Sequence, residues 1–301
     1  MSILSLQNVV KRYHNHTAVN NTSFEVPKGS IFGLLGPNGA GKTSLIRIIT
    51  TITGADSGTI LLDGEPLNLD HPKDIGYMPE ERGLYKKMKV GEQLLYLAQL
   101  KGLSKKESKQ HLKYWLEKFD IMDWWDKKIE ELSKGMQQKI QFIATVVHDP
   151  KLLILDEPFS GLDPINTNLI KDEIYELNQK GKSIIFSTHR MEQVEEICEE
   201  IVLINKGDKI LQGKVDKIKE DHKENVFELK FDGRLPAGFA DDTFSVIEDS
   251  DEKLLIKIRE GHNSNELLSR IITSGIHLRS YREVLPTLNE IFIKNVGYSD
   301  E

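Results

Sequence analysis

An eight-residue stretch near the N-terminus reads Gly36-Pro37-Asn38-Gly39-Ala40-Gly41-Lys42-Thr43. It matches the phosphate-binding pattern G-x-x-x-x-G-K-[ST]. Glycines let successive backbone N–H groups turn inward around phosphate oxygens, and the helix predicted to follow presents the unsatisfied donors of its first turn to the same anion. The pattern therefore predicts that Lys42 contacts the β- and γ-phosphates of a nucleotide and that the Thr43 hydroxyl ligates Mg²⁺.

A second stretch, Leu152–Glu157, supports this prediction. It is an apolar strand pattern that ends in two carboxylates, Asp156 and Glu157. Nucleotide-hydrolysing proteins with such a glycine loop use a carboxylate at the end of a buried strand to hold Mg²⁺, which we expect of Asp156. Glu157 follows directly, where a carboxylate can polarise the attacking water or accept its proton.

The apolar patterns of the whole chain predict an α/β protein with a smaller α+β part. In residues 1–214, strands are predicted at 3–10, 17–26, 29–36, 151–155 and 183–188, with hairpins at 57–67 and 202–213. Helices are predicted at 44–51, within 90–148, at 165–180 and at 191–200. Beyond Asp216, strands are predicted at 226–231, 243–248, 253–258 and 276–282, and helices at 263–274 and 286–295.

Composition excludes several classes of protein. The 301 residues include 40 Lys and Arg, 47 Asp and Glu, and a single cysteine, Cys198. The net charge of −7 argues against a broad nucleic-acid-binding surface, and one cysteine excludes an internal disulfide framework. No apolar run approaches the length of about 20 residues that a membrane span needs, and no secretory signal precedes the first strand. Residues 1–214 carry 28 basic and 29 acidic side chains and residues 215–301 carry 12 and 18, so we predict a domain boundary near Lys214.

Four further features of the sequence resemble one family. Residues 132–139 read Leu132-Ser133-Lys134-Gly135-Met136-Gln137-Gln138-Lys139, which resembles the signature motif, usually L-S-G-G-Q, of ATP-binding cassette (ABC) ATPases. Ser160-Gly161-Leu162-Asp163 resembles the D-loop of this family, and His189 resembles its switch histidine. Tyr13 matches the aromatic residue that stacks on adenine. Because these motifs occur in the order and spacing of the family, the chain is identified as a member of it.

The resemblance implies the fold and the site. A P-loop NTPase cassette is expected over 1–214, with a RecA-like core, an antiparallel β subdomain and a helical signature subdomain at about 86–148, followed by a small α+β domain at 215–301. ATP is expected to bind Tyr13, Gly36, Pro37, Asn38, Gly39, Ala40, Gly41, Lys42 and Thr43. The implied catalytic residues are Glu157, His189 and Glu80, and the implied Mg²⁺ ligands are Thr43, Glu80 and Asp156.

The family also pairs two cassettes head to tail. The resemblance therefore implies that the ATP held by one cassette is contacted by the signature segment of a second cassette, which is either another copy of this chain or a paralogue. The signature residues are Ser133, Lys134, Gly135 and Gln137, and Asp163 belongs to the D-loop.

Two departures from the family pattern stand out. Lys134 occupies a signature position that is usually glycine, and Met136 one that is usually glutamine. Glu80 stands where the family has a glutamine that contacts Mg²⁺ and water. A carboxylate is also a hard oxygen donor, so we expect Glu80 to be tolerated beside the phosphates when metal is bound.

The segment Pro79–Tyr85 and the C-terminal extension resemble a subgroup of bacterial exporter ATPases similar to the sodium-exporting ABC system. This likeness implies a Mg²⁺-dependent ATPase at the cytoplasmic face of the membrane that energises a separate permease. Tyr85, Met88 and Tyr96 are expected either to face that permease or to pack in the core. Sodium, drugs, peptides or lipids all remain possible cargo. The alternative is a soluble ABC ATPase that acts on a macromolecular partner.

Overall fold

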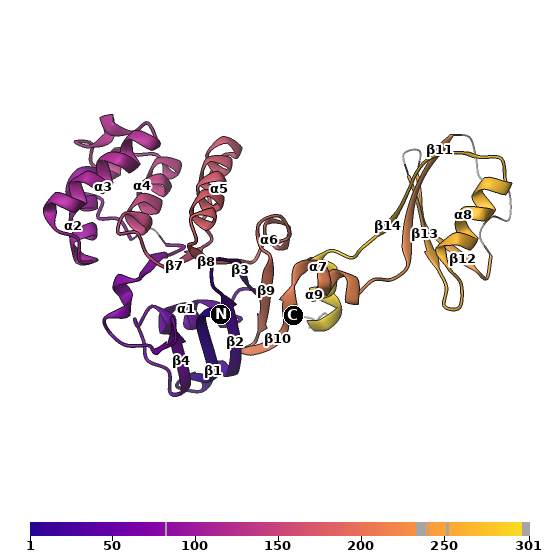
Figure 1. The fold of residues 1–301 in the computed structure, drawn as a ribbon, viewed down its shortest axis with the longest axis horizontal. Coiled ribbons are helices and arrows are strands. Elements are labelled where there is room, and N and C mark those ends of the chain that lie inside the picture. The colour runs from indigo at the N-terminus through magenta and orange to yellow at the C-terminus, as the bar shows by residue number, and fades with distance from the viewer. Residues whose placement is uncertain (82, 233–238, 240, 251–252, 297–301) are drawn as a thin grey trace. The chain divides into compact units, whose positions relative to one another are not determined.

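A computed structural model describes residues 1–81, 83–232, 239, 241–250 and 253–296. The chain divides into two compact units, Met1–Val215 and Asp216–Glu301. Figure 1 labels the helices and strands of both units.

The larger unit is built around a six-stranded sheet in the order β10-β9-β3-β8-β7-β6. Its strands are β3 (Ile31–Leu35), β6 (Ile75–Met78), β7 (Leu152–Asp156), β8 (Ser183–Thr188), β9 (Glu200–Asn205) and β10 (Asp208–Lys214). All neighbours pair in parallel except β9 and β10. β3, β7 and β8 are buried along their whole length, as expected of parallel strands covered on both faces. Their carboxyl ends meet at one edge of the sheet, where α/β proteins bind ligands.

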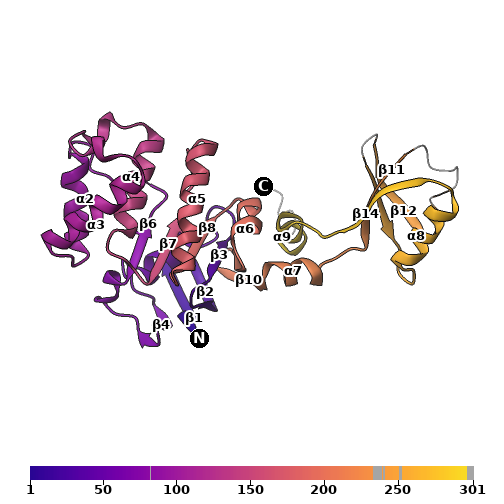
Figure 2. The ribbon, with the colours of Figure 1, turned by 45° about the horizontal axis from the view of Figure 1, so that its top comes forward.

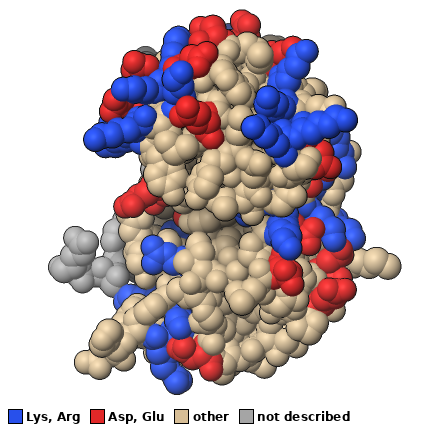
Figure 3. Space-filling view, turned by 90° about the vertical axis from the view of Figure 1, so that its left-hand side faces the viewer, with Lys and Arg blue, Asp and Glu red and all other residues tan. Residues whose placement is uncertain are grey.

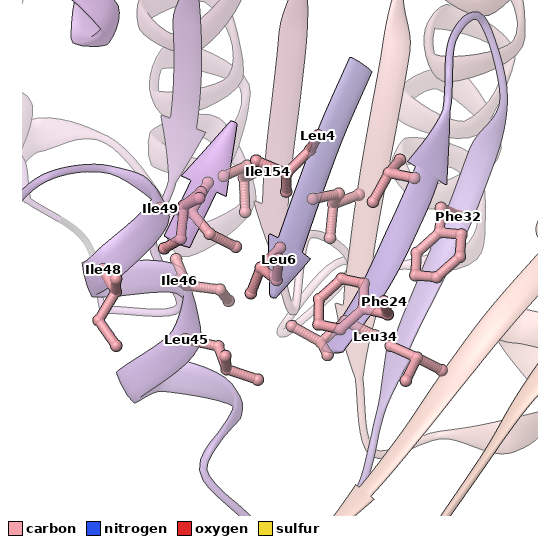
Figure 4. Close-up of a cluster of buried hydrophobic side chains, with 14 of the residues drawn as sticks. Leu4, Leu6, Phe24, Phe32, Leu34, Leu45, Ile46, Ile48, Ile49 and Ile154 are labelled. Carbon is pink, nitrogen blue, oxygen red and sulfur yellow. The ribbon is translucent and has the colours of Figure 1, made fainter. Parts of the chain in front are cut away.

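A second, antiparallel sheet has the order β2-β1-β4-β5. It consists of β1 (Ser2–Tyr13), β2 (His16–Pro27), β4 (Ser57–Leu62) and β5 (Glu65–Pro66). Helix α1 (Lys42–Ile49) packs between this sheet and the parallel one, and Figure 4 shows side chains of both sheets and of α1 converging on a shared core. Within this core the rings of Phe24 and Phe32 stack with centroids 5.9 Å apart. The shared core therefore holds α1, and with it the first turn of this helix, in place between the two sheets.

A group of three helices lies to one side of the sheets in Figures 1 and 2, and one of them, α4, packs on β6. These helices are α2 (Val90–Leu100), α3 (Lys105–Lys118) and α4 (Lys134–Val146). Two short 3₁₀ turns, at Met122–Trp124 and Ile129–Glu131, lie between α3 and α4, and a further one, at His71–Lys73, precedes β6. α3 begins with a capping box between Ser104 and Glu107, and Trp115, Phe119 and Phe142 pack its inner face against α4. Beside the parallel sheet lie α5 (Pro164–Gln179) and α6 (Met191–Ile197).

The smaller unit contains a four-stranded antiparallel sheet in the order β12-β13-β11-β14. Its elements are α7 (Val215–Asp221), β11 (Val226–Asp232), β12 (Phe244–Asp249), β13 (Leu254–Ile258), α8 (Ser264–Thr273), β14 (His277–Val284) and α9 (Leu288–Val296). Leu267 and Ile271 of α8 pack on Leu229, Leu254 and Ile256 of the sheet, so this unit has a core of its own.

The predicted α/β architecture is confirmed, with corrections at particular elements. The sequence patterns missed β6 and α7; β6 has only four residues and includes a glycine, and its pairing with β7, in which Ile75 lies opposite Leu152, makes it a strand. The helix predicted from residue 44 begins at Lys42. Glu200, predicted as the last residue of a helix, is the first residue of β9, because that strand pairs with β3.

Candidate functional site

The glycine loop joins the end of β3 to the start of α1. Gly41 precedes the helix with φ of 110°, in the left-handed region, and no side chain caps the first turn. A Cβ at this position would lie 2.2 Å from the carbonyl oxygen of Ala18. Only glycine fits at this position. Because no side chain caps the first turn of α1, its backbone donors are available to an anion.

Lys42 lies at the first position of α1 and is 8% exposed. Its ammonium donates to the carbonyls of Gly36 (2.6 Å) and Pro37 (3.1 Å) within the same loop. Burial lowers the pKa of Lys42, and the negative charges of Asp156, Glu157 and Glu80 oppose this shift. The lysine is thus held inside the loop, where the acidic side chains influence its charge.

Two acidic side chains emerge where β7 ends. The hydroxyl of Ser187 on neighbouring β8 donates to Asp156 (2.7 Å), and burial raises the pKa of Asp156. Glu157 accepts hydrogen bonds from the hydroxyl of Thr188 (3.0 Å) and from the backbone N–H of His189 (2.8 Å). Nδ1 of His189 lies 2.6 Å from the same carboxylate and carries the hydrogen in this contact. The end of β8 therefore orients both acids.

These parts meet around a hollow of about 240 Å³. Its lining residues are Tyr13, His16, Ala18, Asn38, Gly39, Ala40, Gly41, Lys42, Thr43, Ser44, Glu80, Asp156 and Glu157. The structure thus brings Tyr13 and Glu80, which are far apart in sequence, to the glycine loop and the acids of β7. His16 was not predicted, although its position opposite Tyr13 in the β1–β2 register follows from the hairpin between them.

The donors around this hollow suit a hard divalent cation. Thr43 offers a hydroxyl, and Glu80 and Asp156 offer carboxylates, which are the oxygen ligands that Mg²⁺ prefers. The raised pKa of Asp156 is caused first by burial and is reinforced by Glu80 and Glu157, and a bound cation would relieve both effects. In the described part of the chain, no group of three His, Cys, Asp or Glu side chains is arranged to hold a metal, so a cation here would need the hydroxyl or the nucleotide as well.

Other predicted site residues lie elsewhere in the chain. Ser133 caps α4 by accepting the N–H of Met136 (3.2 Å), with Lys134 and Gly135 in the first turn. Gln137 donates to the carbonyls of Ile129 (3.2 Å) and Leu132 (3.0 Å), so it fixes its own loop.

The D-loop residue and the histidine are also outside the lining. Asp163 caps α5 and accepts the N–H of Asn166 (3.0 Å), a contact that lowers the pKa of Asp163. His189 reaches the site only through Glu157. A single copy of the chain therefore does not gather the signature and D-loop residues at the hollow.

Together, the glycine loop before α1, the acids at the end of β7 and the separate helical group define a P-loop nucleotide-binding cassette. Residues 19–160 match the family model described as ABC transporter, and residues 213–296 match the C-terminal domain of DrrA1-3-like ATP-binding proteins. The chain is 42% identical to the uncharacterized ABC transporter ATP-binding protein YhaQ of Bacillus subtilis, over 98% of this chain and 99% of that protein. It belongs to the ABC transporter ATP-binding proteins.

Two further comparisons agree with this assignment. The linearmycin resistance ATP-binding protein LnrL of Bacillus subtilis is 32% identical, over 98% of each chain. A solved structure titled as the ATP-binding subunit of an ABC transporter has a TM-score of 0.68 at 29% identity, and covers 73% of this chain and 93% of that one. The chain is thus the ATP-binding subunit of an ABC transporter, with relatives in resistance systems and an additional C-terminal domain. No helix in the described residues has both the length and the apolarity to cross a membrane.

Proposed function

We propose that this chain hydrolyses Mg²⁺-bound ATP to energise a bacterial ABC exporter. In this proposal the glycine loop and Lys42 hold the phosphates, and Tyr13 stacks on adenine. Thr43, Asp156 and Glu80 are the residues that would hold Mg²⁺, which when bound supplies charge neutralisation for the transferring phosphoryl group. Glu157 accepts the proton of the attacking water.

The observation that carries the proposal is the lining of the hollow. It brings Lys42 and Glu157 into the lining of one space that Tyr13 also borders. Phosphoryl transfer depends on positioning and on charge stabilisation, and this arrangement provides both. His189 holds Glu157 through two contacts, so we assign it to orienting that carboxylate and sensing the γ-phosphate.

Hydrolysis in this proposal requires a second copy. The signature residues and Asp163 lie outside the hollow of their own chain, which fits a role at the nucleotide of a partner cassette. The N-terminus of α4 presents backbone donors that would stabilise the phosphoryl charge there. ATP would then act as the bridge that closes the dimer.

A permease is the proposed membrane partner, at the cytoplasmic face. Two relatives carry a function in their names: one is a linearmycin resistance ATP-binding protein and the other a Nod factor export ATP-binding protein. Tyr85, Tyr96 and Leu100 are 54%, 44% and 62% exposed, and the two tyrosine rings meet edge to face at 6.3 Å. Figure 3, seen from the side that carries α2 and α3, shows surface without charged side chains that is bordered by basic and acidic ones. Exposed aromatic and aliphatic side chains such as Tyr85, Tyr96 and Leu100 fit an insertion from a partner protein.

The soluble alternative makes a different prediction for purification. If the chain acts on a macromolecule in solution, it will be recovered from native extracts without a polytopic membrane protein. We expect instead that tagged chain, solubilised gently from membranes, brings one such protein with it in stoichiometric amount.

Replacing the proposed base tests the chemistry. Glu157→Gln keeps the size of the side chain but removes the proton acceptor, so we expect turnover to fall by about a hundredfold or more while ATP binding persists. Size-exclusion chromatography with ATP should show the variant trapped as a dimer. The matched control is Glu25→Gln, an exposed position on β2, which should behave as wild type. Unchanged turnover in Glu157→Gln would remove Glu157 from the mechanism.

A further inference from the structure

Helix α4 covers the outer edge of β6. β6 is the edge strand of the parallel sheet among the described residues, because only β7 pairs with it. The exposed carbonyls of such an edge need other donors. His148, just after α4, lies 3.3 Å from the carbonyl of Ile75, and the Thr145 hydroxyl lies 3.4 Å from that of Tyr77. Burial lowers the pKa of His148 to about 4, so its ring is neutral at pH 7.

The same face of α4 carries two glutamines nearer its N-terminus. The amide of Gln141 donates to the carbonyl of Pro79 (2.7 Å), directly before Glu80. The amide of Gln138 donates to the carbonyl of Pro158 (2.9 Å), directly after Glu157. Both side chains are buried, at 4% and 2% exposure, and their spacing of three residues places them on one face of the helix. One helical turn thus contacts the two segments that carry the acids of the site.

Packing alone does not account for Gln141. Its Nε2 must face Pro79, since only that end of the amide can donate to a carbonyl, and its Oε1 is buried with no hydrogen-bond partner in the described structure. An unpaired buried acceptor lowers stability, and an apolar residue of similar size would avoid this cost. The hydrogen bond that the Gln141 amide donates to the carbonyl of Pro79 is therefore the contribution that an apolar residue could not make.

We propose that Gln138 and Gln141 are positioning residues for ATP hydrolysis, which hold the segments of Glu157 and Glu80 at fixed distances from α4. This inference rests on the proposed function of the hollow. Gln141 acts through Glu80, which would hold Mg²⁺. Gln138 acts through Glu157, which would accept the proton of the attacking water. Because Ser133 caps the same helix, a nucleotide of the partner copy that contacts the start of α4 shifts both acids together.

The test uses three single variants of the full chain, assayed together with wild type. Gln141→Met and Gln138→Met remove the amides and keep unbranched side chains of similar length. Thr145→Val is the matched control, because it removes a buried hydroxyl from the same face of α4 that contacts the backbone carbonyls of Gln141 (2.9 Å) and Tyr77 (3.4 Å) and not a proline beside an acid. The measurements are kcat, KM for ATP, Tm, and the affinity of the ATP complex for Mn²⁺ by electron paramagnetic resonance.

We expect Gln141→Met to lower kcat and Mn²⁺ affinity, each by about 10- to 100-fold, with KM for ATP within about twofold. Gln138→Met should lower kcat by about the same factor with a smaller change in Mn²⁺ affinity, since Glu157 is outside the proposed metal set. Thr145→Val should lower Tm and leave kcat and Mn²⁺ affinity as in wild type.

Two results would overturn the inference. One is wild-type kcat and Mn²⁺ affinity in both glutamine variants. The other is a fall of kcat that follows the loss of Tm equally in all three variants, which is the behaviour of a packing role. Absence of turnover in wild type would instead refute the proposed hydrolysis, and the Mn²⁺ affinities of Gln141→Met and Thr145→Val would still decide whether Gln141 positions Glu80.

Discussion

At Glu157 the backbone takes a conformation that side chains rarely adopt. Its φ is 50°, and its N–H donates to the carbonyl of Ser187 (2.8 Å). A non-glycine residue in this left-handed region costs about 1–2 kcal/mol, so the surrounding contacts must hold it there. The hydrogen bonds that the Glu157 carboxylate accepts from the Thr188 hydroxyl and the backbone N–H of His189 do so, and they direct the carboxylate that we propose as the base. The strained backbone conformation therefore belongs to the residue that we propose as the base.

The glycines of the loop give a residue-scale prediction. Gly41→Ala places a Cβ 2.2 Å from the carbonyl of Ala18 at φ +110°, so we expect the free energy of unfolding to fall by about 2–5 kcal/mol. Gly39→Ala is the control: its φ is +78° and its Cβ would meet no atom within 4 Å, so a loss of about 1–2 kcal/mol is expected. Urea unfolding of the two variants measures the difference. Equal losses would show that close approach to Ala18 is unimportant.

Between elements, an ion cluster joins the helical group to the core. Lys118 of α3 lies 2.6 Å from Glu173 and 2.6 Å from Glu176, both on α5. Burial raises the pKa of Glu173, and Lys118 opposes that shift. Hydrogen bonds from Lys118 and Lys180 lower the pKa of Glu176 to about 2. Lys118 therefore compensates a buried acid that would otherwise destabilise the contact between α3 and α5.

Removing that lysine tests the contact. Lys118→Met leaves Glu173 buried without its cation, so we expect a loss of about 2 kcal/mol in the free energy of unfolding at pH 7. Lys180→Met, which removes an exposed partner of Glu176 on the same helix, should cost about 0.5 kcal/mol or less.

The pH dependence of the lysine variant has a definite sign. The pKa of Glu176 is lower folded than unfolded, so its contribution is present above about pH 4.5 and is lost as pH falls towards about 2. Calorimetry should show that the difference in the free energy of unfolding between wild type and Lys118→Met becomes smaller as the pH falls over that range. A gap that widens in acid would contradict the assignment.

On the scale of the whole molecule, the described residues of each compact unit include a hydrophobic core of their own. One lies between the sheets and α1 of the larger unit, and the other beneath α8 of the smaller unit. The net charge of −7 is also unevenly divided, with −1 over residues 1–214 and −6 over residues 215–301. We propose that the first part is the ATPase cassette and that the second braces it or contributes to the dimer.

Truncation after Val215 tests this division. Because the cassette has its own core, we expect residues 1–215 to unfold in one cooperative transition and to bind ATP. We expect the ATP-dependent dimer of the truncated chain to be weaker than that of the full chain in size-exclusion chromatography. A truncated chain with unaltered ATPase rate and unaltered dimer would remove both proposed roles of residues 216–301.

The sequence by itself determined that the chain contains a nucleotide-binding cassette. Glycines that must adopt positive φ, a lysine at the start of a helix and acids after an apolar strand are local requirements, so residues 36–43 and 152–157 indicated nucleotide chemistry without a structure. Other features were decided by the tertiary structure alone. β6 is a strand because β7 pairs with it, and Gln138 and Gln141 face the site segments because α4 packs over that edge. The acceptors of those glutamines are backbone carbonyls, which every residue has, so no sequence pattern marks such contacts.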